Sequence, residues 1–400
     1  MMGHARLSGP RATALRLAGR LSRGPRADGD VREVVVIKPD NLGDVLLASP
    51  ALHLLASRLP AARITLAVGP WSEAMARRLP GVDRVELVPF PGLGRGRQPS
   101  PWARWLLLAR LARRWRGRFD AGLVLRDDFY WGAMLLAAAR VPVRAGAATP
   151  ACAPFLTRAV QPTRRPTAVQ HLSVAALVAG GAAGPDTWTP ERRLRFVRGD
   201  DASAAGDLCR RAGFGADEAY ALLHPGAGAA IKLWTAESWA AVVQGLHAAS
   251  GLRTLVVAGP GEQQLIPPIV RRCQGVASAA PVAPDLDTLA ALLRRARLVL
   301  GPDSGPLHLA AALDTPSVRL YGPTDPAVWG PWADPRRHRW VGSSLLCAPC
   351  DRLSWDDLDL PWHPCVSRLD PDAVLAAAMA ALARTPAPLP GGEGLARAAP

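Results

Sequence analysis

The segment LVLGPDSGPLHLAAALDTP, residues 298–316, has the order of a buried strand, a tight turn and a helix. Its first apolar residues are typical of a strand buried on both faces of a parallel sheet. Ser304 stands where a helix N-cap is expected, and Pro306 fits the first helical turn, where its missing N–H costs nothing. Gly305 lets another backbone approach closely. Such a unit predicts an α/β protein with a parallel sheet.

Strand-like and helix-like runs alternate along the rest of the chain. Strands are predicted at 34–37, 64–68, 85–88, 123–125, 220–223, 252–258, 298–300 and 318–321. Helices are predicted at 46–59, 265–273, 289–295, 306–313 and 372–384, and after an N-cap at Thr235. Two such alternations in tandem predict two Rossmann-like domains that face each other across a central cleft.

Composition suggests how these parts are divided. The expected units are a basic, disordered tail (1–30), an N-terminal Rossmann-like domain (31–185), a connection (186–219), a C-terminal Rossmann-like domain (220–370), a helix (371–385) and a disordered tail (386–400).

The chain carries a formal net charge of +15. This charge favours anionic partners such as a membrane surface, an acidic glycan, a nucleotide or a nucleic acid, without choosing among them. No recognised nucleic-acid-binding module accompanies the charge, so nucleic acid is not an expected partner. No apolar run is long enough for a spanning helix, and the N-terminus lacks the apolar core of a secretory signal, so we expect a cytoplasmic protein.

Only two of the 48 basic residues are lysines, and both follow predicted strands. Lys38 lies in VVVIKPDNLGD (34–44), and Lys232 lies in HPGAGAAIKLWTAESW (224–239). The second segment resembles a dinucleotide-binding turn that lacks its third glycine, which is weak evidence for a dehydrogenase. Lys232 can present a compact charge to a phosphate, and a solvated loop lysine is an equally good interpretation.

Two further features could carry chemistry. The free N–H groups of the helix after Asp303 suit a pyrophosphate, and His308 in its first turn is near enough to donate to the same anion. Ordinary capping explains Ser304 but not Asp303, Gly305 and His308 together. Asp44 opens a predicted helix, where it either interacts with free N–H groups or points into the cleft as a general base.

These segments, in this order, resemble glycosyltransferase family 9, the heptosyltransferase family, over roughly residues 33–385. The resemblance implies a GT-B fold and an inverting, metal-independent transfer from a nucleotide-diphosphate sugar, ADP-heptose in the best-known members, to a cell-envelope glycan or glycolipid. No cofactor is implied. It makes Asp44 the catalytic base, assigns a donor-binding group, and places an acceptor-side loop at Lys38, Asn41 and Gly43. The donor-binding group is Lys232, Asp303, Ser304, Gly305, His308 and, more loosely, Glu262.

Two other functions remain open at this point. A nucleotide-sugar epimerase on the same fold would release an altered sugar without an acceptor. A non-catalytic protein that binds nucleotide sugars or glycans would keep the fold and lose the reaction.

Possible metal ligands have simpler interpretations. Asp285 and Asp287 form an Asp-x-Asp pair at a predicted helix start, where capping suffices, and a second pair, Asp357 and Asp359, lies in an acidic loop. Cys347, Cys350 and Cys365, with His363, have the ligand types of a zinc site. Reduced thiols are the preferred interpretation.

Residues 91–119 contain eight arginines and no acid, with Trp102, Trp105 and Trp115 among them. Leu107, Leu108, Leu111 and Trp115 could line one face of a helix that covers the sheet. The remaining face is either an ordinary basic surface or a patch that contacts anionic lipid or a phosphorylated acceptor glycan.

Overall fold

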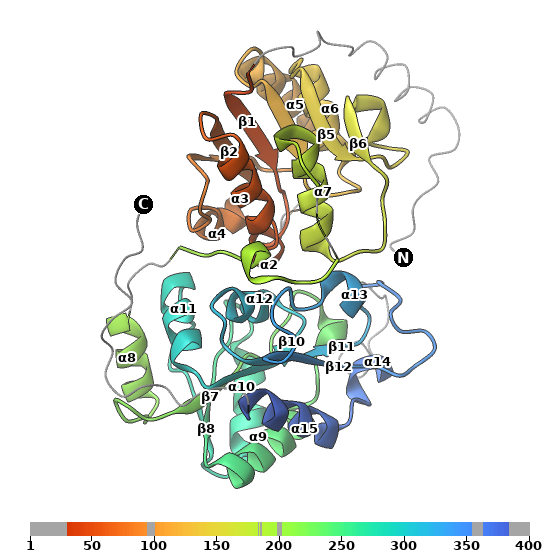
Figure 1. The fold of residues 1–400 in the computed structure, drawn as a ribbon. Coiled ribbons are helices and arrows are strands. Elements are labelled where there is room, and N and C mark those ends of the chain that lie inside the picture. The colour runs from red at the N-terminus through yellow and green to blue at the C-terminus, as the bar shows by residue number, and fades with distance from the viewer. Residues whose placement is uncertain are drawn as a thin grey trace.

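The computed structural model describes residues 30–93, 101–182, 184, 186–197, 202–353 and 363–383. Apart from residue 30, the predicted tails lie outside this part of the chain, as do Asp357 and Asp359. The described residues form two parallel six-stranded sheets with interleaved helices (Figure 1).

The strands are β1 (Glu33–Ile37), β2 (Arg63–Val68), β3 (Arg84–Leu87), β4 (Ala121–Val124), β5 (Val143–Ala147), β6 (Arg158–Val160), β7 (Tyr220–Leu223), β8 (Arg253–Val256), β9 (Ala277–Ala279), β10 (Leu298–Pro302), β11 (Ser317–Tyr321) and β12 (His338–Gly342). The helices are α2 (Leu42–Leu46), α3 (Ser49–Arg58), α4 (Glu73–Ala76), α5 (Pro101–Trp115), α6 (Tyr130–Ala138), α7 (Thr167–Ala179), α8 (Ala202–Arg211), α9 (Ala236–Ser250), α10 (Ile266–Arg272), α11 (Leu286–Arg295), α12 (Gly305–Ala312), α13 (Pro326–Trp329), α14 (Pro364–Ser367) and α15 (Pro371–Leu382).

Both sheets have the same topology. The strand orders are β3-β2-β1-β4-β5-β6 and β12-β11-β10-β7-β8-β9, so the order reverses between β1 and β4 and between β7 and β10. Ligands of such sheets bind beyond the carboxyl ends of the strands at these reversal points. The loops after β1 and β4, and after β7 and β10, are therefore the positions where a site is expected.

The predicted α/β fold with two Rossmann-like sheets is confirmed, and each of the eight predicted strands is present. Four strands were not predicted: β5, β6, β9 and β12. The strands β6 and β9 are three-residue edge strands, too short to show a pattern. In β5, Arg144 interrupts the apolar run, yet its side chain is buried because Nε donates to Phe155 O and Nη1 to Val141 O.

The prediction of one helix over 46–59 was wrong. The segment forms α2 and α3, with a break at Leu47 and Ala48. Pro50 has no N–H to donate to the carbonyl of Leu46, so the first helix cannot continue through it. The break leaves α2 as a separate short helix at the junction of the two halves.

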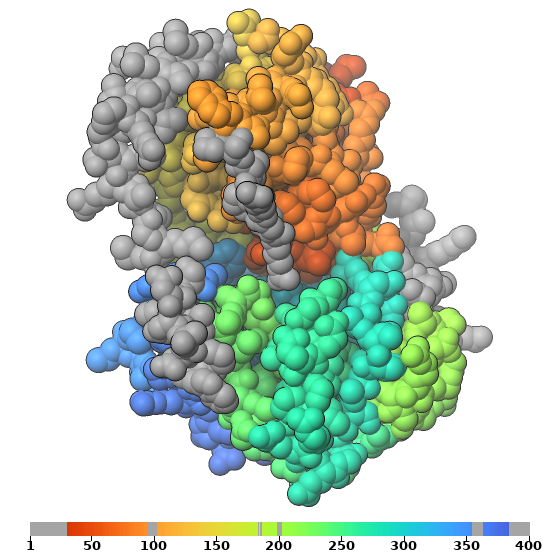
Figure 2. Space-filling view, turned by 180° about the vertical axis from the view of Figure 1, so that it is seen from behind, coloured from red at the N-terminus to blue at the C-terminus, as the bar shows by residue number. Residues whose placement is uncertain are grey.

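The two halves are in contact through polar bonds and through a shared apolar core. Arg78 Nε donates to Asp287 Oδ1 at 2.8 Å, and Thr167 Oγ1 donates to Val328 O at 3.0 Å. One cluster of buried apolar side chains includes residues of both sheets, among them Val36 and Leu222. In Figure 1, α2 and α12 meet at this junction. Figure 2 shows the junction from behind, where the red and orange surface meets the green and cyan surface.

No helix in the described part of the chain is long and apolar enough to cross a bilayer.

Candidate active site

Asp44 lies in the first turn of α2, directly at the junction. Within the described residues its carboxylate makes no hydrogen bond or ion pair, so it does not cap the helix by a side-chain bond. Burial, and then the nearby carboxylate of Asp40, raise the pKa of Asp44 to about 6 against the opposing charges of Lys38 and Lys232. The result is a carboxylate that ionises close to neutral pH without a partner, as a general base requires.

Gly43, the residue before Asp44, touches the opposite half of the molecule. A Cβ at Gly43 would lie 2.7 Å from the Cα of Gly305, the first residue of α12. At Gly305 itself, a Cβ would lie 3.5 Å from the nitrogen of Gly43. The sequence predicted that another segment of backbone approaches Gly305 closely. In the folded chain that segment is the backbone at Gly43. This contact brings Asp44 beside the loop that follows β10.

That loop carries a compact polar cluster around Asp303, which is buried. Lys232 Nζ lies 2.7 Å from Asp303 Oδ2, and Thr324 Oγ1 donates to the same oxygen at 3.0 Å. The ammonium of Lys232, with help from His308, holds the pKa of Asp303 well below its usual range despite burial. Asp303 is therefore permanently ionised, and it orients the second of the two lysines toward the junction.

His308 is buried and neutral. Arg319 Nη1 lies 3.0 Å from His308 Nδ1, and because arginine only donates, Nδ1 is the acceptor and the proton sits on Nε2. Nε2 in turn lies 3.7 Å from Asp303 Oδ1. Burial, and then the adjacent Arg319, lowers the pKa of His308 to about 4. The sequence suggested that His308 donates to a bound pyrophosphate. In the folded chain its N–H faces the carboxylate of Asp303.

Ser304 occupies the N-cap position of α12, as predicted, but its hydroxyl makes no cap bond. Its Oγ is buried without a hydrogen-bond partner in the described residues. The N-terminal N–H groups of α12 are thus left uncapped by this side chain. A hydroxyl and a helix N-terminus together can accept an anion.

The loop after β1 is held by a buried ion-pair network. Lys38 Nζ lies 2.8 Å from Asp40 Oδ2 and donates to Leu125 O at 3.1 Å. Arg126 Nη1, after β4, donates to Asp40 Oδ1 at 2.5 Å. Lys38 is therefore a structural cation that fixes the loop. Asn41, also predicted in this loop, is exposed and its side chain forms no cap bond.

Glu262 lies in the loop after β8, just before a short turn at Gln263–Leu265. Its Oε2 accepts from Gly259 N at 3.0 Å and lies 3.4 Å from His224 Nε2. A Cβ at Gly226 would come within 2.2 Å of the same oxygen, so a larger residue there would displace the Glu262 carboxylate where the loops after β7 and β8 meet.

The possible metal ligands have other contacts. Asp285 caps α11 by accepting from Thr288 N at 2.8 Å, which confirms the capping interpretation, and Asp287 binds Arg78. His363 Nδ1 lies 3.3 Å from Cys365 Sγ. Among the described residues, no group of three or more histidine, cysteine or acidic side chains is placed to hold a metal ion.

Sequence reasoning missed four residues of this site. Asp40 and Arg126 fix the first loop, and Arg319 and Thr324 support the Asp303 cluster. Arg319 did leave a signal, because it is an arginine in the middle of the apolar strand SVRLY and is fully buried. A buried charge of this kind requires partners, and functional sites supply them.

Comparison with known proteins agrees with this geometry. The model of glycosyltransferase family 9 (heptosyltransferase) matches residues 108–354. The chain belongs to this family. The family 9 fold is also found in solved structures: E. coli ADP-heptose lps heptosyltransferase II has a TM-score of 0.66 and 19% identity over 88% of this chain and 99% of that one. The glycosyl transferase family 9 protein from Veillonella parvula has a TM-score of 0.69 and 20% identity over 91% of this chain and 100% of that one.

Lipopolysaccharide heptosyltransferase 3 of Escherichia coli is 34% identical over 133 residues, which cover 32% of this chain and 38% of that protein. The matched stretch thus spans less than half of this relative.

Proposed function

We propose that this family 9 protein transfers a sugar from a nucleotide-diphosphate sugar to a hydroxyl group of a cell-envelope glycan or glycolipid. Heptose from ADP-heptose is the first donor to test, because ADP-heptose is named for a protein of the same fold. The observation that carries the proposal is the unpartnered carboxylate of Asp44, which faces the Lys232–Asp303 pair across the junction.

The two carboxylates have different tasks because their environments move their pKa values apart. Asp303 stays ionised and orients Lys232. Asp44, with a pKa of about 6, takes the proton of the acceptor hydroxyl. That oxygen attacks the anomeric carbon from the side opposite the diphosphate, and the carbon–oxygen bond to the diphosphate breaks with its electron pair, which inverts the configuration.

The departing diphosphate gathers negative charge, which must be met by fixed positive groups. Lys232 has three N–H donors, and Asp303 occupies part of this capacity. The N-terminus of α12 and the hydroxyl of Ser304 add neutral donors on the same side of the junction. His308 is neutral, so it supports Asp303 and does not supply charge. We infer that these groups together can stabilise the charge on the diphosphate without a metal ion.

The assay that tests this function follows ADP-heptose with and without heptose-deficient lipopolysaccharide. A transferase releases ADP in amounts that equal the heptose appearing on the acceptor. An altered sugar formed without any acceptor would instead support the epimerase, and binding without turnover would support the non-catalytic protein.

We further propose that helix α5 binds an anionic membrane surface, which would place the protein at the cytoplasmic face of a membrane. The inner face of α5 packs on the sheet, with Leu111 and Trp115 buried. The outer face exposes 78% of Trp102, 46% of Trp105 and 60% of Leu106. These side chains have the character of an interfacial belt, with amphipathic rings that favour the headgroup region.

Arginines on this helix and in the turn just after it support an anionic partner. Arg110, Arg113 and Arg116 are exposed and form no ion pair within the described residues, whereas Arg118 Nη1 binds Glu86 at 3.0 Å. Each free arginine near an anionic surface contributes about 1 kcal/mol. Flotation with phosphatidylglycerol vesicles tests this. The Trp102→Ser variant should lose binding, and Trp340→Ser, at an exposed tryptophan of the other half, should keep it. Equal binding to phosphatidylcholine vesicles would contradict the proposal.

A further inference from the structure

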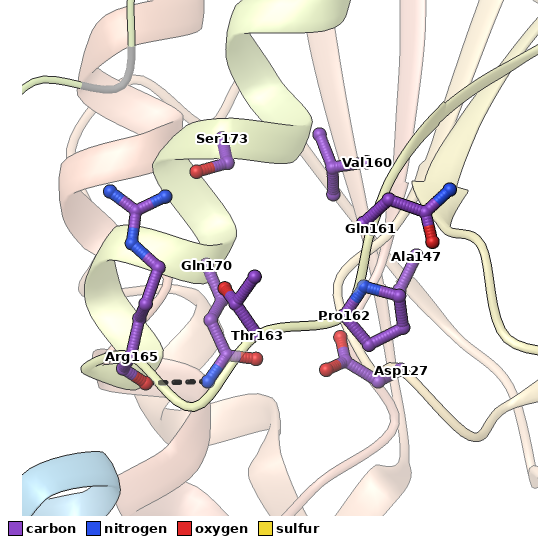
Figure 3. Close-up of a pocket in the computed structure, with 9 residues that line it drawn as sticks. All are labelled: Asp127, Ala147, Val160, Gln161, Pro162, Thr163, Arg165, Gln170 and Ser173. Atoms are coloured by element: carbon purple, nitrogen blue, oxygen red, sulfur yellow. Dashed lines mark hydrogen bonds between the residues drawn. The ribbon is translucent and has the colours of Figure 1, made fainter.

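A pocket of about 240 Å³ lies in the N-terminal half, at the carboxyl ends of three strands (Figure 3). Asp127 follows β4, Ala147 and Val160 end β5 and β6, and Gln170 and Ser173 project from α7. Gln161, Pro162, Thr163 and Arg165 complete the lining. These strands continue the sheet edge that begins at β1. Strand spacings of about 4.8 Å put the pocket roughly 10–14 Å along this edge from the loop that leads to Asp44.

Asp127 has no structural task that accounts for its carboxylate. Only its backbone carbonyl is used, as an acceptor for Thr149 Oγ1 at 3.0 Å and Cys152 Sγ at 3.3 Å. The carboxylate makes no hydrogen bond or ion pair within the described residues, although burial raises its pKa. In Figure 3 it lies at the pocket, opposite the α7 residues. The side chain is only partly buried, so this unpaired carboxylate is open to a ligand in the pocket.

The cations near the pocket are each paired with another carboxylate, although Lys38 and Arg126 also favour the ionised form of Asp127. Arg165 Nε donates to Asp186 Oδ1 at 2.6 Å, and Lys38 lies 2.8 Å from Asp40. Arg126 is shared between Asp40 and Asp128. A phosphate or carboxylate in the pocket would therefore meet the negative charge of Asp127 while Arg165, the cation of the lining, is already paired with Asp186.

The other polar groups also present acceptors. Gln170 Nε2 donates to Arg165 O at 2.6 Å, which leaves its amide oxygen for a ligand. Ser173 Oγ donates to Val169 O at 2.8 Å, so the lone pairs of Oγ remain able to accept a hydrogen bond from a ligand. Val160, Pro162 and Ala147 add an apolar wall (Figure 3). A ligand for this lining must bring several donors and an apolar face, as the hydroxyl groups and C–H face of a sugar ring do.

We propose that this pocket binds a neutral, hydroxyl-rich sugar of the acceptor glycan, with the carboxylate of Asp127 accepting hydrogen bonds from its hydroxyl groups. The sugar bound here is a neighbour of the one whose hydroxyl reaches Asp44. The proposal rests on the transferase function proposed above and names the substrate class of its acceptor side: the pocket selects neutral sugars and excludes sugar acids.

Saturation-transfer NMR with methyl glucoside and methyl glucuronide tests this, because the two probes differ only in a neutral or acidic C6 group. The wild-type protein should bind the glucoside and reject the glucuronide. Asp127→Asn keeps the shape but loses the charge-assisted acceptor, so glucoside affinity should fall about tenfold. Asp207→Asn, an exposed acid on α8 in the other half, is the matched control and should bind like wild type.

Equal binding of the two probes by wild type, binding of neither, or an Asp127→Asn variant that binds the glucoside like wild type would overturn the pocket assignment. Because the carboxylate bonds nothing, Asp127→Asn should unfold no earlier than wild type, so lost binding reports the pocket. ADP titrated into the same samples separates the two proposals. Protein that binds the glucoside but not ADP contradicts transfer from an ADP-sugar, and protein that binds ADP but neither sugar contradicts the pocket.

Discussion

The close contact between Gly43 and Gly305 makes Gly43→Ala a sharp test of how the two halves work together. The added Cβ would lie 2.7 Å from the Cα of Gly305, so the backbones must separate by roughly 0.7 Å to reach the 3.4 Å at which ordinary contact begins. Both partners are main chain, and no flexible side chain can absorb the shift. Overpacking of this kind costs about 1–3 kcal/mol.

The displacement moves Asp44 away from the Lys232–Asp303 pair, so chemistry should suffer more than donor binding. A misplacement near 1 Å can lower kcat by about 100-fold, and we expect a fall of about 10- to 100-fold here. The assay measures ADP release from ADP-heptose with heptose-deficient lipopolysaccharide, together with the Kd for ADP. The ADP affinity should stay near that of wild type, because Lys232 and α12 lie in the C-terminal half.

The control is Gly206→Ala on α8, where the Cβ would meet the flexible ends of Arg210 at 3.4 Å and Arg295 at 3.6 Å. This variant should behave like wild type. A Gly43→Ala enzyme with unchanged kcat would refute the reasoning, because the junction would then tolerate a shift that the geometry excludes.

Three further changes follow from the same contacts. Lys232→Arg should lower kcat strongly, since the larger guanidinium cannot keep the compact position 2.7 Å from Asp303, and a rate equal to wild type would contradict this. Arg319→Met should lower the free energy of unfolding by about 1–3 kcal/mol, because it leaves His308 Nδ1 buried without a donor and removes a second donor from the Leu307 carbonyl; urea unfolding measures it. Asp44→Asn should be more stable than wild type at pH 8 and equal to it near pH 3. The folded-state pKa of about 6 lies above the 3.8 of an ordinary aspartate. The stability that the protonated carboxyl contributes is therefore complete below pH 3.8 and is lost as pH rises through 6. If the wild-type and Asp44→Asn proteins gave the same unfolding curve at pH 8 as well as near pH 3, the raised pKa would be contradicted.

Local patterns predicted much of the fold. Apolar runs followed by glycine-bearing turns gave the positions of eight strands. The loops with Asp44, Lys232 and Asp303 were predicted to follow strands, and the folded chain places those strands at the reversal points of the two sheets. The edge strands β6 and β9 were missed because three residues carry no periodicity. The helix break at Leu47 was missed because of Pro50. A proline breaks a helix when it lies inside one, but it fits the first turn of a new helix, and Pro50 lies in the first turn of α3.

The partners of the site residues could not be predicted, because they come from distant segments. Asp40 meets Arg126 across 86 positions of sequence, and Lys232 meets Asp303 across 71. The charge of His308 depends on Arg319, which approaches from the neighbouring strand. The sequence identified groups that could carry charge, and their ionisation states depend on contacts that only the folded chain creates.

The central claim is that Asp44 is the general base of a transfer reaction at the junction. The most direct measurement compares kcat for ADP-heptose with lipopolysaccharide acceptor in wild type and Asp44→Asn, over a range of pH. Wild-type kcat should rise with pH through about 6, as Asp44 loses its proton. Asp44→Asn should lose about 100- to 10,000-fold in kcat while it binds ADP normally. An Asp44→Asn enzyme with wild-type kcat at saturating substrates would contradict the account.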